Sequence, residues 1–198
     1  MLATSDIPQA DVLWHVARVP EAIVRGHATH EAIGAYLGAK GQRQGLYYAQ
    51  AARVLGLVGE PEADGTVPLT PYGRAFAQYD RSAQSTALRR LLREQEPTRS
   101  VLRALRERGG LDYEEIASVL QQLAPLAAST ARRRAHTAAA WLVSAGLAAW
   151  REGKLVAASA PPASRGWALV RRRAGNAARS LVGAQQRCAL TGLSVRWW

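Results

Sequence analysis

The sequence is poor in cysteine and has no long apolar run. Cys188 is the single cysteine among 198 residues, so an internal disulfide and a zinc-binding cluster of thiolates are both excluded. No stretch approaches the roughly 18 uncharged apolar residues of a membrane span. The opening residues lack the basic-then-apolar order of a signal peptide. These absences predict a cytoplasmic protein with no membrane partner.

Patterns for catalysis and metal binding are also missing. The four histidines, His15, His27, His30 and His136, are scattered along the chain. His27 and His30 together with Glu31 lack a further ligand for a metal. No phosphate-cradling GxxxxGK[ST], HExxH, GxSxG or D…ExK pattern is present. We therefore expect no catalytic residues, no metal and no cofactor, and the sequence favours a binding protein over an enzyme.

Lysine is scarce, whereas arginine is abundant and unevenly placed. Only Lys40 and Lys154 are lysines among the 26 basic residues, and the net charge is +11. Residues 1–96 carry ten basic and ten acidic side chains, whereas residues 97–198 carry sixteen and five. Arginine suits bidentate contacts with phosphate and guanine. The basic half predicts double-stranded DNA as the partner and a nucleoid-associated protein; a solubilising charged surface is the alternative.

The order of the expected elements is that of two winged-helix units. Residues 1–80 predict three helices, the third ending at Gly56, then strands at 57–58 and 66–70, then a helix from Pro71. Residues 97–156 repeat the order: a helix to Arg108, a helix capped by Asp112, a helix from Ser129 or Thr130, and a hairpin around REGK. The fold class is mainly α with small β-hairpins, as a tandem winged helix-turn-helix.

The remaining segments connect or follow these units. Residues 81–96 predict an amphipathic connecting helix with Leu88, Leu91 and Leu92 as its apolar stripe. We expect this stripe to pack the two units together, and a homodimer seam is the alternative. Residues 157–198 predict a linker rich in Ala, Pro and Ser, then a basic C-terminal tail.

In a winged helix the third helix enters the major groove and the wing contacts the backbone or the minor groove. The expected contacts of the second unit are Arg132, Arg133, Arg134, His136 and Thr137 on the helix, with Arg151 and Lys154 on the wing. Three consecutive residues span about 200° of a helix. We therefore expect at least two of the arginines to reach DNA and one to pair with Glu114 or Glu115, with a solvated charged face as the alternative.

The first unit and the tail offer further contacts. The third helix of the first unit carries Gln42, Arg43, Gln44 and Tyr47, but its wing, EPEADG, is acidic, so this unit either contacts DNA or serves as a packing module. Of Tyr47 and Tyr48, one ring is expected in the core. In the tail, Arg171, Arg172 and Arg173 follow phosphates or form a basic arm.

Two tryptophans flank the expected strand of the second unit. Trp141 precedes this strand and Trp150 ends it. Aromatic side chains at such places most often belong to the core, which is the interpretation that we favour. A pocket for an extrahelical or methylated base is the alternative.

Residues 41–57, GQRQGLYYAQAARVLGL, and 68–77, PLTPYGRAFA, carry a family resemblance. They resemble a winged-helix domain found beside restriction endonucleases and other defence modules of bacteria. The resemblance covers about 50 residues and implies a DNA-associated function in restriction-modification or defence, or as a regulator, without implying a reaction.

Residues 185–193, QQRCALTGL, are similar to the opening of HNH nuclease domains of restriction enzymes. Six residues follow Gly192, and the His and Asn positions of that family are not among them. The resemblance implies an alternative, an HNH-type restriction endonuclease that lacks its catalytic part. A protein-interaction scaffold is the third candidate, because winged helices also bind proteins.

Overall fold

The computed structural model describes residues 1–39 and 42–158, and the side chain of Gln42, a predicted contact, lies outside the described part. Over this range the chain is mainly helical, with eight α-helices, one short 3-10 helix and one two-stranded antiparallel sheet. Residues 1–158 form one compact unit. The expected tail, with Arg171, Arg172, Arg173 and the segment similar to HNH domains, lies outside the described residues.

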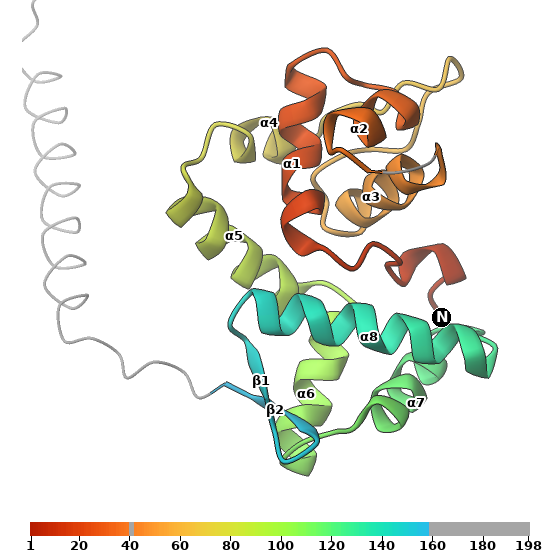
Figure 1. The fold of residues 1–198 in the computed structure, drawn as a ribbon, viewed down its shortest axis with the longest axis vertical. Coiled ribbons are helices and arrows are strands. Elements are labelled where there is room, and N and C mark those ends of the chain that lie inside the picture. Colours follow the sequence, from red (N-terminus) through yellow and green to blue (C-terminus); the bar gives the residue numbers. More distant parts are fainter. Residues whose placement is uncertain (40–41, 159–198) are drawn as a thin grey trace, which may run out of the picture. The chain divides into compact units, whose positions relative to one another are not determined.

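The first helical group follows the 3-10 helix Thr4–Asp6 and contains α1 (Leu13–Val24), α2 (His30–Tyr36), α3 (Gln42–Val54) and α4 (Pro71–Phe76) (Figure 1). Two threonines cap helices of this group: the Thr29 hydroxyl accepts a hydrogen bond from the Ala32 amide, and the Thr70 hydroxyl accepts one from the Gly73 amide. α1 continues through Pro20 and ends at Val24.

The expected strands of the first wing are reduced to isolated bridges. Val58 pairs with Leu69, and Thr29 pairs with Thr66, without a continuous ladder. Pro68 lies between the two bridged residues of the return segment and has no backbone N–H to donate. The prediction of two regular strands is therefore wrong for this wing, although the chain still doubles back here.

The second helical group contains α6 (Thr98–Arg108), α7 (Tyr113–Leu123) and α8 (Ala128–Ser144), followed by β1 (Ala148–Arg151) and β2 (Lys154–Ala157). Asp112 and Glu115 form the capping box of α7, in which each side chain accepts from the other's backbone amide. Glu152 and Gly153 both have positive φ, as a two-residue hairpin turn requires. Leu111 bridges to Leu155, as the single strand residue expected there.

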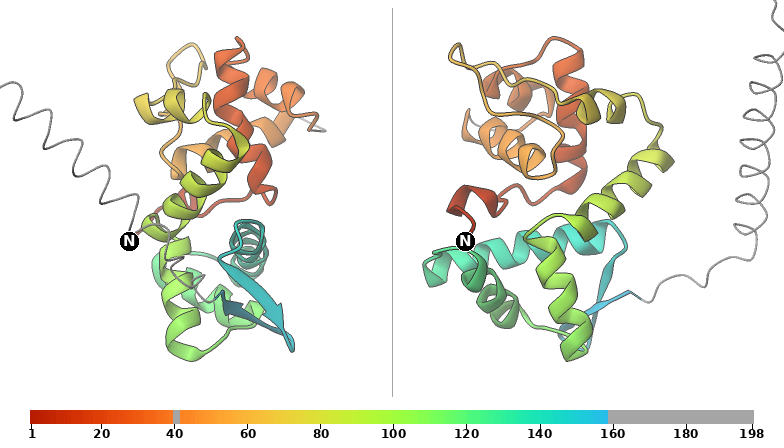
Figure 2. Two further views of the ribbon diagram at one scale, coloured as in Figure 1. Left: turned by 90° about the vertical axis from the view of Figure 1, so that its left-hand side faces the viewer. Right: turned by 180° about the vertical axis from the view of Figure 1, so that it is seen from behind.

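α5 (Arg81–Glu94) runs between the two helical groups, as the two views of Figure 2 show. Its apolar stripe of Leu88, Leu91 and Leu92 is buried. These leucines belong to one continuous core shared by both groups. The expected packing of this helix within the chain is confirmed, and the stripe is not exposed as a seam for a second copy.

The N-terminal segment ties the first group to the second. The Leu2 amide donates to the Leu123 carbonyl over 2.9 Å. Ile7 is fully buried, and the indole N–H of Trp141 donates to the Ala10 carbonyl over 2.7 Å. The residues that precede α1 thus lie against α8, although the two segments are far apart in the sequence.

Candidate nucleic-acid interface

α8 presents one exposed stripe along its 17 residues. Its buried face consists mostly of alanines together with Trp141 and Leu142, which face the core. The exposed positions recur at helical spacing, so they share one side of the helix. They are Ser129, Arg132, Arg133, His136, Ala140, Val143 and Ser144, besides the first residue.

The three consecutive arginines of α8 take three different directions. Arg132 pairs with Glu114, with 2.8 Å between its Nε and a carboxylate oxygen, which confirms the expected ion pair. Arg133 is exposed and has no ion pair within the described residues. Arg134 is only 5% exposed, and its guanidinium donates to the Ile7 carbonyl. Arg134, one of the predicted contacts, therefore lies off the exposed stripe, because the N-terminal segment packs over it.

His136 and Thr137 also differ from each other. His136 is exposed and stacks on Tyr113, with 3.7 Å between ring centroids. Thr137 is only 4% exposed and its hydroxyl donates to the Arg133 carbonyl. Of these two predicted contacts, only His136 lies on the exposed face, since the next position along α8 turns toward the core.

The hairpin β1–β2 extends the same surface. Arg151 is exposed, whereas Lys154 lies 3.6 Å from a carboxylate oxygen of Glu115. Trp150 is 37% exposed and its ring centroid lies 4.6 Å from that of Tyr113. The Tyr113 ring therefore joins the hairpin to the exposed stripe of α8.

Trp141 and Trp150 differ in burial. Trp141 is fully buried and hydrogen-bonded to the chain, which confirms the interpretation as core for this residue. Trp150 instead lies partly exposed at the surface. The two tryptophans do not form a common pocket.

α3 contributes polar side chains from its first turns. Arg43 and Gln44 are exposed and Tyr47 is half-buried. Tyr48 is buried, and its hydroxyl lies 3.2 Å from Nδ1 of His15. The expected division between the two adjacent tyrosines is confirmed, with Tyr48 as the ring in the core.

Side chains of α3, α8 and the segment before α1 line a surface hollow of about 410 Å³. Its lining residues are Gln9, Asp11, Gln44, Tyr47, Arg133, Arg134, His136 and Thr137. Six of these eight are predicted contacts, four from α8 and two, Gln44 and Tyr47, from α3. Gln9 and Asp11 were not predicted, because nothing local in the sequence indicates that the segment before α1 reaches α8.

Arg133, Arg134 and Asp11 are the fully charged side chains that line this hollow. Burial, followed by the charge of neighbouring Arg133, lowers the pKa of Arg134 to about 10. The guanidinium therefore still carries its charge at neutral pH. No carboxylate forms an ion pair with Arg133 or Arg134 within the described part of the chain.

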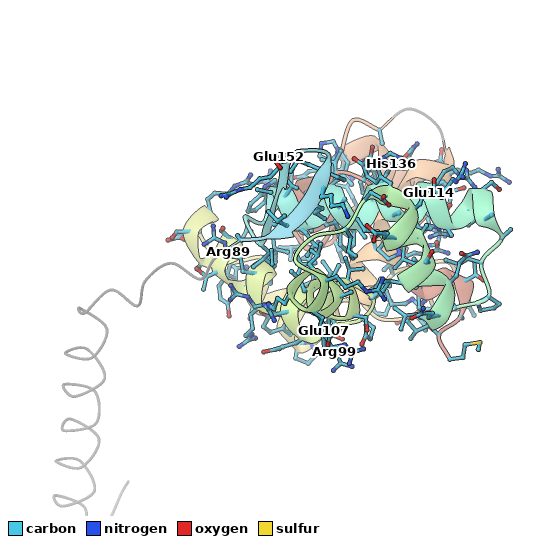
Figure 3. The ribbon with its side chains drawn as sticks, turned by 90° about the horizontal axis from the view of Figure 1, so that it is seen from below. Arg89, Arg99, Glu107, Glu114, His136 and Glu152 are labelled. Atoms are coloured by element: carbon cyan, nitrogen blue, oxygen red, sulfur yellow. The ribbon has the colours of Figure 1, made fainter. Side chains whose placement is uncertain are left out.

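The exposed face of α8 and the outer face of α6 lie on different sides. Figure 3 shows His136, Glu114 and Glu152 along one edge of the view, with Arg99 and Glu107 along the opposite edge. α6 carries several exposed arginines of its own, at 99, 103, 106 and 108. This opposite face provides matched control positions for tests of the α8 surface.

Over residues 1–39 and 42–158, no group of three or more His, Cys, Asp or Glu side chains is placed to hold a metal ion. In the same described range, no helix combines the length and the apolar character that crossing a membrane requires.

A mainly helical chain with one small hairpin and a polar hollow between two helices matches a family of domains of unknown function, DUF7226, over residues 16–144. The match spans more than half of the 198 residues; the chain belongs to this family. It runs from α1 to the last residue of α8 and stops before the hairpin. No curated protein and no solved structure matches the chain.

Proposed function

We propose that this chain binds duplex DNA, with the exposed stripe of α8 in the major groove and the hairpin β1–β2 against the neighbouring backbone. In this proposal both helical groups are winged-helix units: α1, α2 and α3 followed by the bridged loop, and α6, α7 and α8 followed by the hairpin. The order of elements in each group supports this assignment.

The observation that carries the proposal is the uncovered stripe of α8 beside an exposed hairpin. The major groove is about 12 Å wide and admits a single helix, and a helix of 17 residues is about 25 Å long. Small Ala140 lies in the middle of the stripe and permits close approach. Arg133 and His136 supply donors for phosphates or base edges, and Val143 supplies an apolar contact of the kind that a thymine methyl group accepts.

The major groove admits one helix, which is α8 in this proposal. The third helix of the first group, α3, therefore takes another role. α3 offers only its first exposed residues, Arg43 and Gln44. We assign them to the phosphates that flank the groove occupied by α8. The exposed acidic loop at Glu60, Glu62 and Asp64 lies on the first group and disfavours a closer approach of its wing to the backbone.

Net charge supports a polyanionic partner but is not concentrated on α8. Residues 1–96 are neutral, residues 97–158 carry nine basic and five acidic side chains, and residues 159–198 carry seven basic and no acidic ones, which together give +11. On the α8 surface, Arg132 and Lys154 are held by Glu114 and Glu115. The proposed interface therefore relies on geometry and a few free cations, with the basic sequence beyond residue 158 adding long-range attraction.

The role in the cell follows from the resemblance of residues 41–57 and 68–77. A winged-helix domain of the kind found beside restriction endonucleases is the DNA-reading part of a restriction or defence system, or a regulator. The corresponding location in the cell is the nucleoid. These assignments belong to the proposal and depend on DNA binding.

The test is binding of the full chain to a labelled duplex by fluorescence anisotropy at two salt concentrations. Arg133→Ala weakens binding by about tenfold or more, as expected for loss of hydrogen bonds to a charged group. It also reduces the slope of log affinity against log salt by about 0.9. The matched control is Arg103→Ala, one turn beyond Arg99 on the exposed face of α6, which removes the same charge and leaves binding nearly unchanged.

Equal effects of the two substitutions would place the contact elsewhere or make it non-specific. Absence of any affinity for duplex DNA at low salt would reject DNA binding and favour the protein-interaction scaffold. A plasmid-nicking assay with divalent metal tests the nuclease alternative, and we expect no cleavage.

A further inference from the structure

Arg134 is a buried cation without an anionic partner in the described residues. Its side chain is 5% exposed, and one of its nitrogens donates to the Ile7 carbonyl. A guanidinium carries five N–H donors, so this bond leaves most of them free. Among the described residues, every side-chain nitrogen or oxygen that is fully shielded from solvent has a hydrogen-bond partner. The other guanidinium nitrogens are therefore accessible, and the opening beside them is the hollow that Arg134 lines.

Burying an unpaired charge is costly, by several kcal/mol in general. Asp11 also lines the hollow but forms no ion pair with Arg134. Arg133, the next residue, is a second unpaired cation at the same hollow. Two adjacent guanidinium groups repel each other, and an anion bound between them removes both the repulsion and the desolvation cost.

The other lining groups indicate which anion fits. Tyr47 and His136 bring aromatic rings from α3 and α8, and Gln9 and Gln44 bring amides. A phosphate linked to a nucleoside uses all of these groups, because guanidinium groups bind phosphate oxygens while rings and amides contact a sugar or a base.

We propose that the hollow between α3 and α8 binds one phosphate group of a nucleic acid, with Arg134 at its floor and Arg133 at its rim. The choice of a nucleic-acid phosphate rests on the proposed function, whereas the anion site itself does not. An internal phosphate of a bound duplex and the terminal phosphate of a strand or free mononucleotide share this chemistry, and the experiment distinguishes them.

The first measurement is thermal unfolding of the full chain in inorganic phosphate, against chloride at equal ionic strength. Phosphate at about 100 times its Kd raises the Tm of the wild-type chain by about 5–10 °C. Arg134→Met keeps the volume and removes the charge. This variant loses the phosphate-dependent rise, and its Tm in chloride equals or exceeds that of the wild type because an uncompensated buried charge is gone.

Two further variants keep the test decisive if Arg134→Met fails to fold. Trp141→Phe removes the other side-chain hydrogen bond from α8 to the same N-terminal segment but leaves both cations; its Tm falls and the phosphate-dependent rise remains. Arg133→Ala alters only an exposed residue and reduces the rise. The proposal would be overturned if phosphate did not specifically raise the Tm of the wild-type chain. It would also be overturned if the rise in Tm survived in Arg134→Met. If Arg134→Met does not fold, a rise in Tm that is unchanged in Arg133→Ala would overturn it instead.

Calorimetric titrations then identify the source of the phosphate and separate this inference from the proposed function. A duplex without terminal phosphates binds the wild type, and Arg134→Met weakens it by about tenfold or more, if the phosphate is internal. Binding of a 5′-mononucleotide without binding of that duplex supports the site through a terminal phosphate and rejects duplex binding. Duplex affinity that is unchanged in Arg134→Met, with no binding of the mononucleotide, rejects the site and leaves duplex binding standing.

Discussion

Glu114 restrains one of the cations that the proposed interface offers. Its carboxylate lies 2.8 Å from Nε of Arg132, and both side chains are 62% exposed. Such an exposed pair contributes at most about 1 kcal/mol to folding, and the helix N-terminus favours an acidic residue by a similar amount. Glu114→Gln therefore lowers the free energy of unfolding by about 2 kcal/mol at most and leaves the fold intact.

The effect on DNA binding has the opposite sign. In the wild-type complex Arg132 stays paired with Glu114 and makes no contact with a phosphate, and the carboxylate repels the nearest phosphate. At a separation of about 7 Å in water the repulsion is about 0.6 kcal/mol, and release of the ion pair adds up to about 1 kcal/mol. Glu114→Gln thus tightens binding by about three- to fifteenfold, and the salt slope steepens by about 0.9 as one more phosphate contact forms.

The assay is fluorescence anisotropy with a labelled duplex between about 0.05 and 0.2 M salt, the range in which counterion release dominates affinity. Glu107→Gln is the matched control, because Glu107 lies at the opposite edge of the molecule (Figure 3) and the charge change is identical. Unchanged or weaker binding by Glu114→Gln, or an equal gain from Glu107→Gln, would refute the placement of DNA against α7 and α8.

Three further outcomes follow from the same structure. Asp112→Ala removes the capping box of α7 and lowers the free energy of unfolding by about 1 kcal/mol, or the Tm by about 2–4 °C; an unchanged Tm would show that the cap is not needed. Gly45→Ala would place a Cβ 1.7 Å from the His30 carbonyl oxygen. The Tm measured by circular dichroism therefore falls by about 6 °C or more, or the chain fails to fold. A variant as stable as the wild type would contradict the close crossing of α2 and α3. Replacing residues 132–134 together by Ala reduces the salt slope by about one to two units in binding titrations, because Arg132 is already paired with Glu114; a full loss of three units would mean that this pair does not hold in the complex.

Local chemistry made much of the fold predictable from the sequence. Asp112 caps the helix that it was expected to begin, since capping depends on residues within one turn. The leucines of α5 are buried as their spacing predicted. The first wing failed because Pro68 removes a donor from the return segment, a local signal that the sequence did contain.

The candidate site was predictable only in part, because burial on α8 depends on a distant segment. Adjacent Arg133 and Arg134 look alike in the sequence, yet one is exposed and the other is covered by residues 7–10. The resulting hollow joins side chains more than 80 residues apart, such as Gln44 and Arg133. Neither periodicity nor charge pattern carries information on such contacts. In the same way, nothing in the sequence around Gly45 indicated that α2 and α3 cross closely there.

The most direct test of the central claim is to map where a duplex contacts the chain, by changes in backbone amide resonances of the labelled protein on addition of DNA. We predict that the changes concentrate on the exposed stripe of α8, at Arg133, His136 and Ala140, and on the hairpin β1–β2, with little change along α6. Changes centred on α6, or none at low salt, would contradict binding through α8.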